Sequence, residues 1–246
     1  MSPPEQSEQL YTKFAAAYAR GMALCGEAGL PGLPGLRRSF DEKGLLEKPL
    51  DDLTEAEARQ IIEEGKEAGL RFYCFKSSHD EMPRVKRVLG FLKSIEMENL
   101  LDIGSGRGVF LWPCMNAFPQ LSVTSLDLLP HRVAMLKAVR RGGAQNLNAE
   151  LGDICGIPLP GKSYDVVAML EVLEHIPDVS AAIRAAVRIA KKYIIITVPS
   201  KPDDNPGHVH LLTKDMLTGL FEKAGCSRLH FDGVAGHLVM IAVPGD

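Results

Sequence analysis

Cysteine is scarce in this sequence, and its few copies form no closely spaced pair. The five cysteines are odd in number and widely separated: Cys25, Cys74, Cys114, Cys155 and Cys226. Zinc ribbons and disulfide frameworks need cysteines in regular sets, so this distribution argues against both. We expect these thiols to be reduced and mostly buried.

An excess of one charge and a long apolar run are also missing. The 246 residues carry 28 Lys and Arg against 31 Asp and Glu, a formal net charge of −3, so no global positive field attracts nucleic acid. The start, "MSPPEQSEQL", lacks the basic and then apolar order of a secretory signal, and no run is long enough for a membrane span. We therefore expect a cytoplasmic protein without a membrane partner, and nucleic acid is disfavoured as a partner.

The first third of the chain has the apolar spacing of helices joined by loops. Thr54, followed three positions later by Glu57, has the pattern of a capping box. The Pro- and Gly-rich stretch "GLPGLPGLRR" predicts a loop over 29–38. Helices are predicted over three segments: 7–28, 54–69 and 82–95. We divide the chain into a helical lid and substrate-side extension, 1–81, and a ligand-binding domain, 82–246.

From Asn99 onward, short β-rich runs alternate with helical segments, which is typical of a parallel sheet covered on both faces. Strands are predicted at Asn99–Ile103, Ser122–Leu126, Asn148–Leu151, Asp165–Met169 and Tyr193–Val198, with two more joined around 233–237. Helices are predicted at Gly108–Ala117, His131–Arg141, Val179–Ala190 and Thr213–Ala224. A simple βαβαβ nucleotide-binding unit does not contain such a long hairpin at its end.

The segment "NLLDIGSGRGVFL" places Gly104, Gly106 and Gly108 between a predicted strand and a predicted helix. Without side chains, such a turn brings backbone amides and a helix N-terminus close to a flat or anionic ligand. A dinucleotide fingerprint needs glycine where Val109 stands, so a nicotinamide enzyme is disfavoured. A tight turn without any ligand is the alternative.

Two aspartates weaken that alternative. Asp127 ends the second predicted strand, where an acidic side chain can accept both hydroxyls of a ribose. Asp153 follows the third strand with Ile154 beside it, so a polar group and an apolar wall can bracket an adenine ring. Asp127 therefore predicts a ligand that carries a ribose, and a further acid, Glu171, lies at the end of the fourth strand.

Four motifs in this order, "LLDIGSGRG", "SLDLLP", "GDICGIPLPGKSYDVVAMLEVLEHI" and the terminal hairpin, resemble the class I S-adenosylmethionine-dependent methyltransferases across about 85–243. The resemblance implies an α/β, Rossmann-like fold with a seven-stranded, mostly parallel sheet whose last strand is antiparallel. It also implies that the glycine turn lies against the amino-acid part of the cofactor, that Asp127 holds the ribose, and that Asp153 holds the adenine. The predicted cofactor residues are Asp102, Gly104, Ser105, Gly106, Gly108, Asp127, Leu128, Asp153, Ile154 and Glu171.

The segment "EVLEHI" adds a cluster of carboxylates and imidazoles. Glu171, Glu174 and His175 can converge on one point, and "PGHVHLLT" brings His208 and His210 to the same edge of the sheet. The cluster is similar to that of the small-RNA 3′-end 2′-O-methyltransferases, which implies a divalent metal held by Glu171, Glu174, His175 and His208. The family-wide alternative is that Glu171 contacts the cofactor or the acceptor, and that His175 orders the loop or acts as a general base.

These observations predict an enzyme that transfers a methyl group from S-adenosylmethionine to an oxygen or nitrogen of a small-molecule acceptor by in-line displacement. Glu171 and His175 are its predicted catalytic residues. Two alternatives stay open. One is a divalent-metal-assisted 2′-O-methyltransferase acting on RNA 3′ ends, and the other is a non-catalytic, S-adenosylmethionine-binding regulatory module.

The segment "GLRFYCFKSSHDEMP" is the predicted source of a lid. Phe72, Tyr73 and Phe75 are expected either to close over cofactor and acceptor or to pack the helical layer onto the sheet. Lys76 and His79 are placed to meet an anionic or hydroxyl group of the acceptor.

Overall fold

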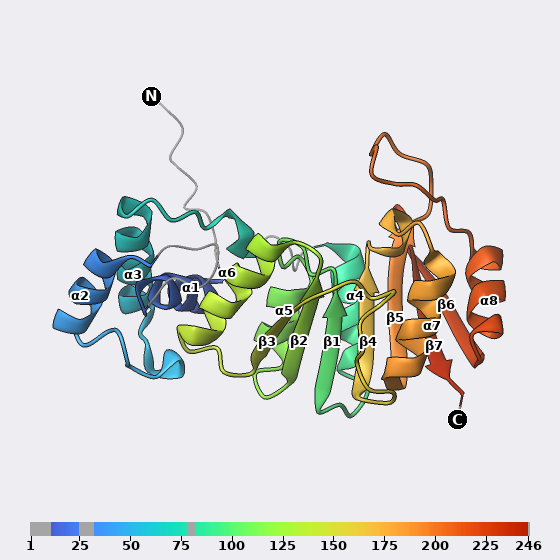
Figure 1. The fold of residues 1–246 in the computed structure, drawn as a ribbon, viewed down its shortest axis with the longest axis horizontal. Coiled ribbons are helices and arrows are strands. Elements are labelled where there is room, and N and C mark those ends of the chain that lie inside the picture. Colours follow the sequence, from blue (N-terminus) through green and yellow to red (C-terminus); the bar gives the residue numbers. More distant parts are fainter. Residues whose placement is uncertain (1–10, 25–31, 78–81, 246) are drawn as a thin grey trace.

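A seven-stranded sheet organises the computed structural model, which describes residues 11–24, 32–77 and 82–245 (Figure 1). The strands are β1 (Asn99–Ile103), β2 (Ser122–Asp127), β3 (Leu147–Leu151), β4 (Tyr164–Leu170), β5 (Ala190–Pro199), β6 (Cys226–Val234) and β7 (His237–Pro244). They lie in the order β3-β2-β1-β4-β5-β7-β6, and β7 runs antiparallel to both of its neighbours, whereas β1 to β5 pair in parallel. The predicted Rossmann-like sheet with an antiparallel last strand is confirmed.

The apolar runs of the central strands follow from their position in the sheet. Ile194, Ile195 and Ile196 of β5 are all fully buried. Successive side chains point to opposite faces of a strand, so three buried neighbours require that both faces be covered. Along the chain, β5 begins at Ala190 rather than at the predicted Tyr193, directly after the preceding helix.

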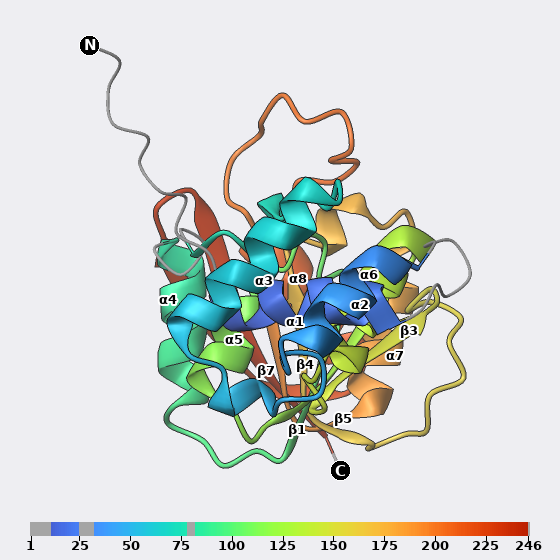
Figure 2. The same ribbon diagram turned by 90° about the vertical axis from the view of Figure 1, so that its left-hand side faces the viewer.

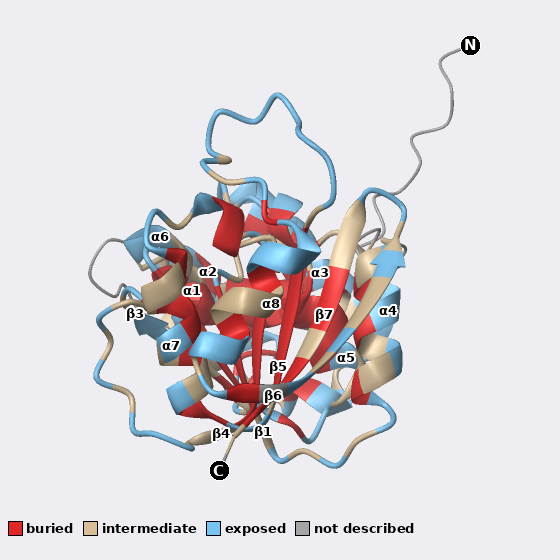
Figure 3. Cartoon of the chain, turned by 90° about the vertical axis from the view of Figure 1, so that its right-hand side faces the viewer, coloured by how far each residue is buried: buried red, intermediate tan, exposed pale blue. Residues whose placement is uncertain are grey.

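Five helices cover the two faces. Residues of α4 (Pro83–Leu92), α5 (Leu111–Ala117) and α6 (Pro130–Arg141) belong to one hydrophobic cluster, and residues of α7 (Val179–Ile189) and α8 (Lys214–Lys223) belong to a second one on the other face. Figure 3 shows α4 and α8 on opposite sides of the β6–β7 hairpin. The start predicted for α5 is wrong: the helix begins at Leu111 rather than at Gly108, because Gly108 has a φ of +79°, outside the helical region.

Three further helices lie beyond the β3 edge of the sheet, next to α6 (Figures 1 and 2): α1 (Thr12–Leu24), α2 (Pro34–Glu42) and α3 (Glu55–Glu67). The capping box predicted for Thr54 and Glu57 is present at the start of α3. The loop predicted over 29–38 is wrong from Pro34 onward, and residues 29–31 lie outside the described chain. Proline suits the first helical turn, because its fixed φ matches the helix and its missing N–H has no partner there.

The contact between α1 and α6 depends on glycine. A Cβ added to Gly21 would lie 1.8 Å from the carbonyl oxygen of Ala138, and one added to Gly142 would lie 1.7 Å from that of Ala17. The two helices therefore meet backbone to backbone, with no room for a methyl group. Residues of α1 also share a hydrophobic cluster with β1, so the division of the chain at 81/82 stays a prediction.

Two of the three predicted lid aromatics belong to the interior. Phe72 and Phe75 are buried, and the Phe75 ring lies 5.0 Å from that of Trp112 on α5. The Trp112 indole N–H donates a hydrogen bond of 2.8 Å to the carbonyl of Cys74, which fixes this segment against the sheet. Closure of these two rings over a ligand is therefore contradicted, because they pack the helical layer onto α5. Tyr73 remains 54% exposed, and His79 lies outside the described residues.

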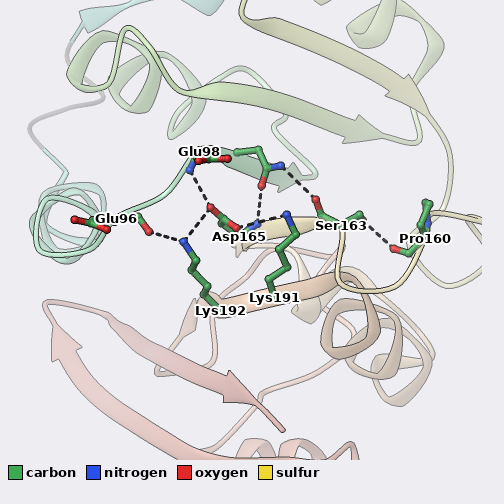
Figure 4. Close-up of polar contacts among 8 residues, drawn as sticks. Glu96, Glu98, Pro160, Ser163, Asp165, Lys191 and Lys192 are labelled. Carbon is green, nitrogen blue, oxygen red and sulfur yellow. Dashed lines mark hydrogen bonds and ion pairs between the residues drawn. The ribbon is translucent and has the colours of Figure 1, made fainter. Parts of the chain in front are cut away.

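A polar network joins β1 and β4 at the amino end of the sheet (Figure 4). Asp165 accepts hydrogen bonds from the Glu98 amide (2.9 Å) and from Lys192 Nζ (3.2 Å), and its own amide donates to Asn99 Oδ1 (2.6 Å). Burial acts to raise the pKa of Asp165, but the Glu98 amide and the two cations Lys192 and Lys191 outweigh it and hold the pKa below its usual range. The network therefore stabilises the amino end of the sheet, and the cavity described below lies at the carboxyl end.

Four cysteines can be placed in the described chain, and all four are free thiols. Cys74, Cys114 and Cys226 are buried and Cys155 is half-buried, whereas Cys25 lies outside the described residues. Within residues 11–24, 32–77 and 82–245, no helix is both long and apolar enough to span a lipid bilayer.

Candidate functional site

A cavity of about 470 Å³ opens at the carboxyl ends of β1, β2 and β4. Parallel strands present the loops that follow them at this edge, which is where open α/β sheets bind ligands. Among the described residues, none before Arg84 lines this cavity, so the helices α1 to α3 contribute nothing to its wall. All but one of the predicted cofactor residues line it, the exception being Gly108. The nine that do are Asp102, Gly104, Ser105, Gly106, Asp127, Leu128, Asp153, Ile154 and Glu171.

The glycine turn adopts the backbone shape that its composition allows. Gly104, Gly106 and Gly108 have φ values of +67°, +58° and +79°, in the left-handed region that favours glycine. A Cβ on Gly106, which lines the cavity, would lie 3.3 Å from the flexible tip of Arg132 and 3.7 Å from the Gly104 carbonyl. Gly108 does not line the cavity. A Cβ there would lie 2.0 Å from Trp112 Nε1, so this glycine is required for internal packing.

Asp102 is a buried acid at the floor of the turn. Its Oδ2 accepts a hydrogen bond of 2.6 Å from Ser105 Oγ, which lies 2.7 Å from Ser125 Oγ. Burial raises the pKa of Asp102 to about 7; the Ser105 hydroxyl opposes this shift and the nearby Asp127 charge adds to it. The group is therefore poised to change charge near neutral pH when a cation enters the cavity.

Asp127 is held by the backbone around it. Its Oδ1 accepts from the Leu129 amide at 2.9 Å, and its Oδ2 accepts from the Gly106 amide at 3.3 Å. Arg132 Nη1 lies 3.6 Å from Oδ2. The side chain is almost fully buried, yet each carboxylate oxygen retains acceptor capacity toward the cavity that it lines.

The residues predicted to bracket a ring form the far wall. Ile154 is buried, and Leu128 is 62% exposed with its side chain at the cavity mouth. Asp153 accepts a hydrogen bond of 2.9 Å from the Cys155 amide, which fixes its carboxylate at the end of β3. An apolar slot with one anchored carboxylate suits a planar heterocycle that carries hydrogen-bond donors.

Glu171 also lines the cavity, and its backbone conformation is strained. Its φ of +58° is unusual for a residue with a side chain. Its Oε1 accepts from Thr197 Oγ1 at 2.8 Å, its Oε2 pairs with His237 Nε2 at 3.0 Å, and Arg84 Nε lies 4.0 Å from Oε1. Four elements, β4, β5, β7 and α4, thus meet at one carboxylate.

The sequence analysis missed three of these partners: Arg84, Thr197 and His237. Each lies in an element predicted for other reasons, and only the pairing of β5 with β7 brings Thr197 and His237 together. A usable signal was the position of His237 at the first residue of the last strand, because β7 is antiparallel and so begins at the carboxyl edge of the sheet.

The predicted metal ligands come together only in part. One ligand atom from each of Glu174, His175 and His208 lies within 4.8 Å of the others. Glu171 is not in this group, because Thr197 and His237 hold its carboxylate. Glu174 is buried, and among the described residues its two carboxylate oxygens have no hydrogen-bond partner. Burial raises the pKa of Glu174 to about 8.

Hydrogen bonds indicate which ring nitrogen of His175 and of His208 acts as a donor or an acceptor. His175 Nδ1 lies 2.8 Å from the Gly207 carbonyl, which can only accept, so Nδ1 carries the proton and Nε2 carries the free lone pair of the neutral ring. His208 Nδ1 lies 2.8 Å from Asp203 Oδ1, and His208 Nε2 accepts a hydrogen bond of 3.0 Å from the Asn205 side-chain amide. His210 Nε2 lies 3.2 Å from the Pro177 carbonyl, which anchors the same loop.

Comparison with known proteins agrees with this geometry. Residues 71–230 match a family described as "Methyltransferase domain". The chain belongs to this methyltransferase family. The matched region runs from the segment before α4 into β6, and so includes the whole cavity wall.

Individual relatives of this methyltransferase-family chain match only part of it. A ubiquinone biosynthesis O-methyltransferase from Pseudomonas aeruginosa is 33% identical over 121 residues, which cover 48% of this chain and 50% of that protein. The chain therefore aligns with about half the length of the curated relatives it matches. Among solved structures, a SAM-dependent methyltransferase from Aquifex aeolicus has a TM-score of 0.55 and 20% identity over 69% of this chain and 94% of that one. YcgJ from Bacillus subtilis has a TM-score of 0.54 and 14% identity over 66% and 98%.

Proposed function

We propose that this chain transfers a methyl group from S-adenosylmethionine to an oxygen or nitrogen of a small-molecule acceptor. The observation that carries the proposal is the cavity itself, because a glycine turn and a buried Asp127 line one part of it and the strained Glu171 lines another. Gly104, Ser105 and Gly106 of the turn all line the cavity, as expected of a turn that binds a ligand.

The residues present fit the cofactor. The volume of about 470 Å³ lies in the range of small-molecule sites. Gly104, Ser105 and Gly106 would hold the amino-acid part, and Asp127 would accept hydrogen bonds from the ribose. Asp153, Ile154 and Leu128 would hold the adenine. When bound, the cofactor supplies a methyl group on a positively charged sulfur, which is the electrophile of the reaction.

The protein's own task is to place the acceptor and to remove its proton. His175 lines the cavity, and its Nε2 carries the free lone pair because Nδ1 donates to Gly207. Nε2 would take the proton that the hydroxyl or amine loses as the new bond to the methyl carbon forms, and the exposed ring would release that proton to solvent. Glu171 would orient the acceptor or the cofactor amine, and it is held in place by the hydrogen bond that it accepts from Thr197 and by its contact with His237.

A small-molecule acceptor is supported by the relatives and by the charge of the chain. The relatives of matching sequence are named for O-methylation in ubiquinone biosynthesis. The near-neutral composition gives no field for nucleic acid. An in-line displacement needs no covalent intermediate with the enzyme, so a cavity lined by positioning groups is sufficient.

Metal-assisted transfer, including 2′-O-methylation of RNA 3′ ends, is a second candidate, favoured by one observation. The buried carboxyl of Glu174 is without a hydrogen-bond partner in the described chain and lies beside His175 and His208. Oxygen and nitrogen donors of this kind suit a divalent ion, which would stabilise the negative charge of an ionised acceptor hydroxyl. Ligation by His208 Nε2 would require displacement of the Asn205 amide.

One experiment separates these candidates. The full chain is incubated with methyl-labelled S-adenosylmethionine and a panel of phenols, catechols, amines and short RNAs, with and without a chelator, and binding of S-adenosylhomocysteine is measured by calorimetry. Metal-independent labelling of a small molecule supports the proposal. Labelling abolished by the chelator and restored by a divalent ion favours the second candidate. Binding without labelling of any acceptor favours a regulatory module, and no binding contradicts all three.

A further inference from the structure

A second cavity, of about 630 Å³, lies on the α4 face of the sheet between α4 and β6. Its floor is apolar and comes from β5 and β7, while two aromatic rings form a side wall: Ile195, Val239, Ile241, Val243, Phe91 and Tyr193. The Phe91 and Tyr193 rings meet edge to face at 5.2 Å. We call this cavity the β7 groove. It is larger than the cofactor cavity.

The β7 groove exists because two neighbours leave it uncovered. On α4, the facing position is Gly90, and a Cβ added there would touch nothing within 4 Å. On β6, the residues that pair with the groove floor are polar: Arg228 opposite Val243, and His230 opposite Ile241. In Figure 3 α4 lies beside the hairpin and α8 is on its other side, so no described helix covers the β6 side of this face.

The upper end of the groove touches the machinery of the cofactor cavity. Val239 of the groove floor pairs directly with Thr197, whose hydroxyl donates to Glu171 at 2.8 Å. His237, the other partner of Glu171, precedes Val239 by two residues. Side chains alternate along a strand, so His237 and Thr197 continue the row of side chains that forms the groove floor. The apolar floor therefore leads up to the Glu171 carboxylate.

At this upper end, the charged side chains come from the two sides of the groove, α4 and β6. Arg87 of α4 forms an ion pair with Asp232 of β6, beside Val239, and Arg84 lies one turn earlier near Glu171. Below the pair, the accessible part of the β7 floor is formed by Ile241 and Val243, because Val239 is almost fully buried, and the charged Arg228 lies beside Val243 on β6. A molecule that fits has a polar head at Glu171 and an apolar tail along β7.

We propose that the β7 groove binds the apolar tail of the methyl acceptor, which is an amphipathic molecule with a hydroxyl-bearing head and a hydrocarbon chain. The inference rests on the proposed function, because it places the reacting hydroxyl at the Glu171 end. Burial of the tail removes apolar area from water and holds the head in one place, so the groove supplies affinity that a small polar head lacks.

The test compares two probes that differ only in the tail. Binding of para-methylphenol and para-octylphenol is measured by calorimetry on the full chain saturated with S-adenosylhomocysteine. We expect para-octylphenol to bind at least about tenfold more tightly, since its extra methylenes enter the groove. In methyl-labelled protein, it should shift the NMR signals of Ile241, Val239 and Val243, and para-methylphenol should not.

Two variants make the result specific. Ile241→Trp fills the groove and should reduce the affinity for para-octylphenol to that for para-methylphenol, with unchanged binding of S-adenosylhomocysteine. Met216→Trp adds the same ring to an exposed position of α8, on the other face, and should change nothing.

An equal affinity for the two probes, or an octyl advantage that survives in Ile241→Trp, would overturn the groove assignment. A concentration-dependent dimer in sedimentation that Ile241→Trp dissociates would overturn it as well, because a second copy would then occupy the groove. If the wild-type chain does not bind S-adenosylhomocysteine at all, the proposed function itself fails. Retained binding with no octyl advantage removes the groove proposal alone.

Discussion

The backbone amide of Gly106 donates a hydrogen bond of 3.3 Å to Asp127 Oδ2, so the glycine turn after β1 and the acid at the end of β2 form one unit. The bond ties the backbone expected against the amino-acid part of the cofactor to the carboxylate expected at its ribose. A change at either residue should therefore alter cofactor binding before it alters the fold.

Asp127→Asn tests this unit. The amide keeps the size of the side chain but loses the charge and one acceptor, so we expect affinity for S-adenosylhomocysteine to fall by about 1.5–3 kcal/mol, the scale of a hydrogen bond to a charged group. Calorimetric titration measures the change. Glu150→Gln, at an exposed position of the neighbouring β3, is the control and should bind normally. Unchanged affinity in Asp127→Asn would contradict the ribose assignment.

Two glycines of the turn should respond differently to alanine. In Gly108→Ala the new methyl would overlap Trp112 and the φ of +79° would be strained, so unfolding free energy should fall by about 2 kcal/mol or more. Gly106 has a φ of +58°, so alanine is strained there too, but its methyl would meet only the tip of Arg132 at 3.3 Å and the Gly104 carbonyl at 3.7 Å, without the overlap that Gly108→Ala creates. Denaturant unfolding and cofactor titration on both variants give the contrast. Equal losses of stability would contradict it.

Cofactor affinity should depend on pH through Asp102. Its pKa is raised to about 7 in the free protein, chiefly by burial, and a cationic ligand favours the carboxylate over the acid. Below about pH 7, Asp102 must therefore release a proton when the ligand binds. Affinity should rise as the pH is increased through that value and then level off. Titrations between pH 6 and 8 measure this slope. Asp102→Asn should remove it, and a slope that persists in this variant would assign the effect to another group.

The packing of α1 on α6 predicts an unusual effect of alanine in a helix. Gly21→Ala should destabilise the chain by about 1–3 kcal/mol, because the new methyl would overlap the Ala138 carbonyl. Gly219→Ala on α8 is the matched control, since a Cβ there would meet nothing within 4 Å. It should stabilise by up to about 1 kcal/mol through helix propensity. Thermal unfolding compares the two, and a stabilising Gly21→Ala would contradict the close contact.

Asp165 should make the free energy of unfolding depend on pH in the acid range. Its pKa is held below the usual value of 3.8, so its contribution is present above that value and is lost as the pH falls through the lowered pKa in the folded state. Asp165→Asn should therefore cost about 1–3 kcal/mol at pH 7 and progressively less as the pH falls through the lowered pKa of the folded state. Denaturant unfolding at pH 7 and over a series of acid pH values tests this, with Asp204→Asn in an exposed loop as control. A deficit that does not change with pH would point to packing instead.

Much of the fold and of the cavity wall was predictable because the deciding interactions are local. The apolar run of β1, the glycines that follow it and the capping box of α3 each depend on a few consecutive residues. Asp127 and Asp153 were predictable for a related reason: the carboxyl ends of parallel strands share one edge, so the end of a strand already places its acid at the site.

The sequence by itself therefore determined the order of the strands along the chain, the shape of the glycine turn and the carboxylates around it. Only the tertiary structure decided which rings face inward, why Gly21 must be glycine, and that Thr197 and His237 hold Glu171. The physical reason is distance along the chain. Such contacts join residues tens of positions apart, and they form only when helices pack and β7 pairs with β5, which local propensity does not specify.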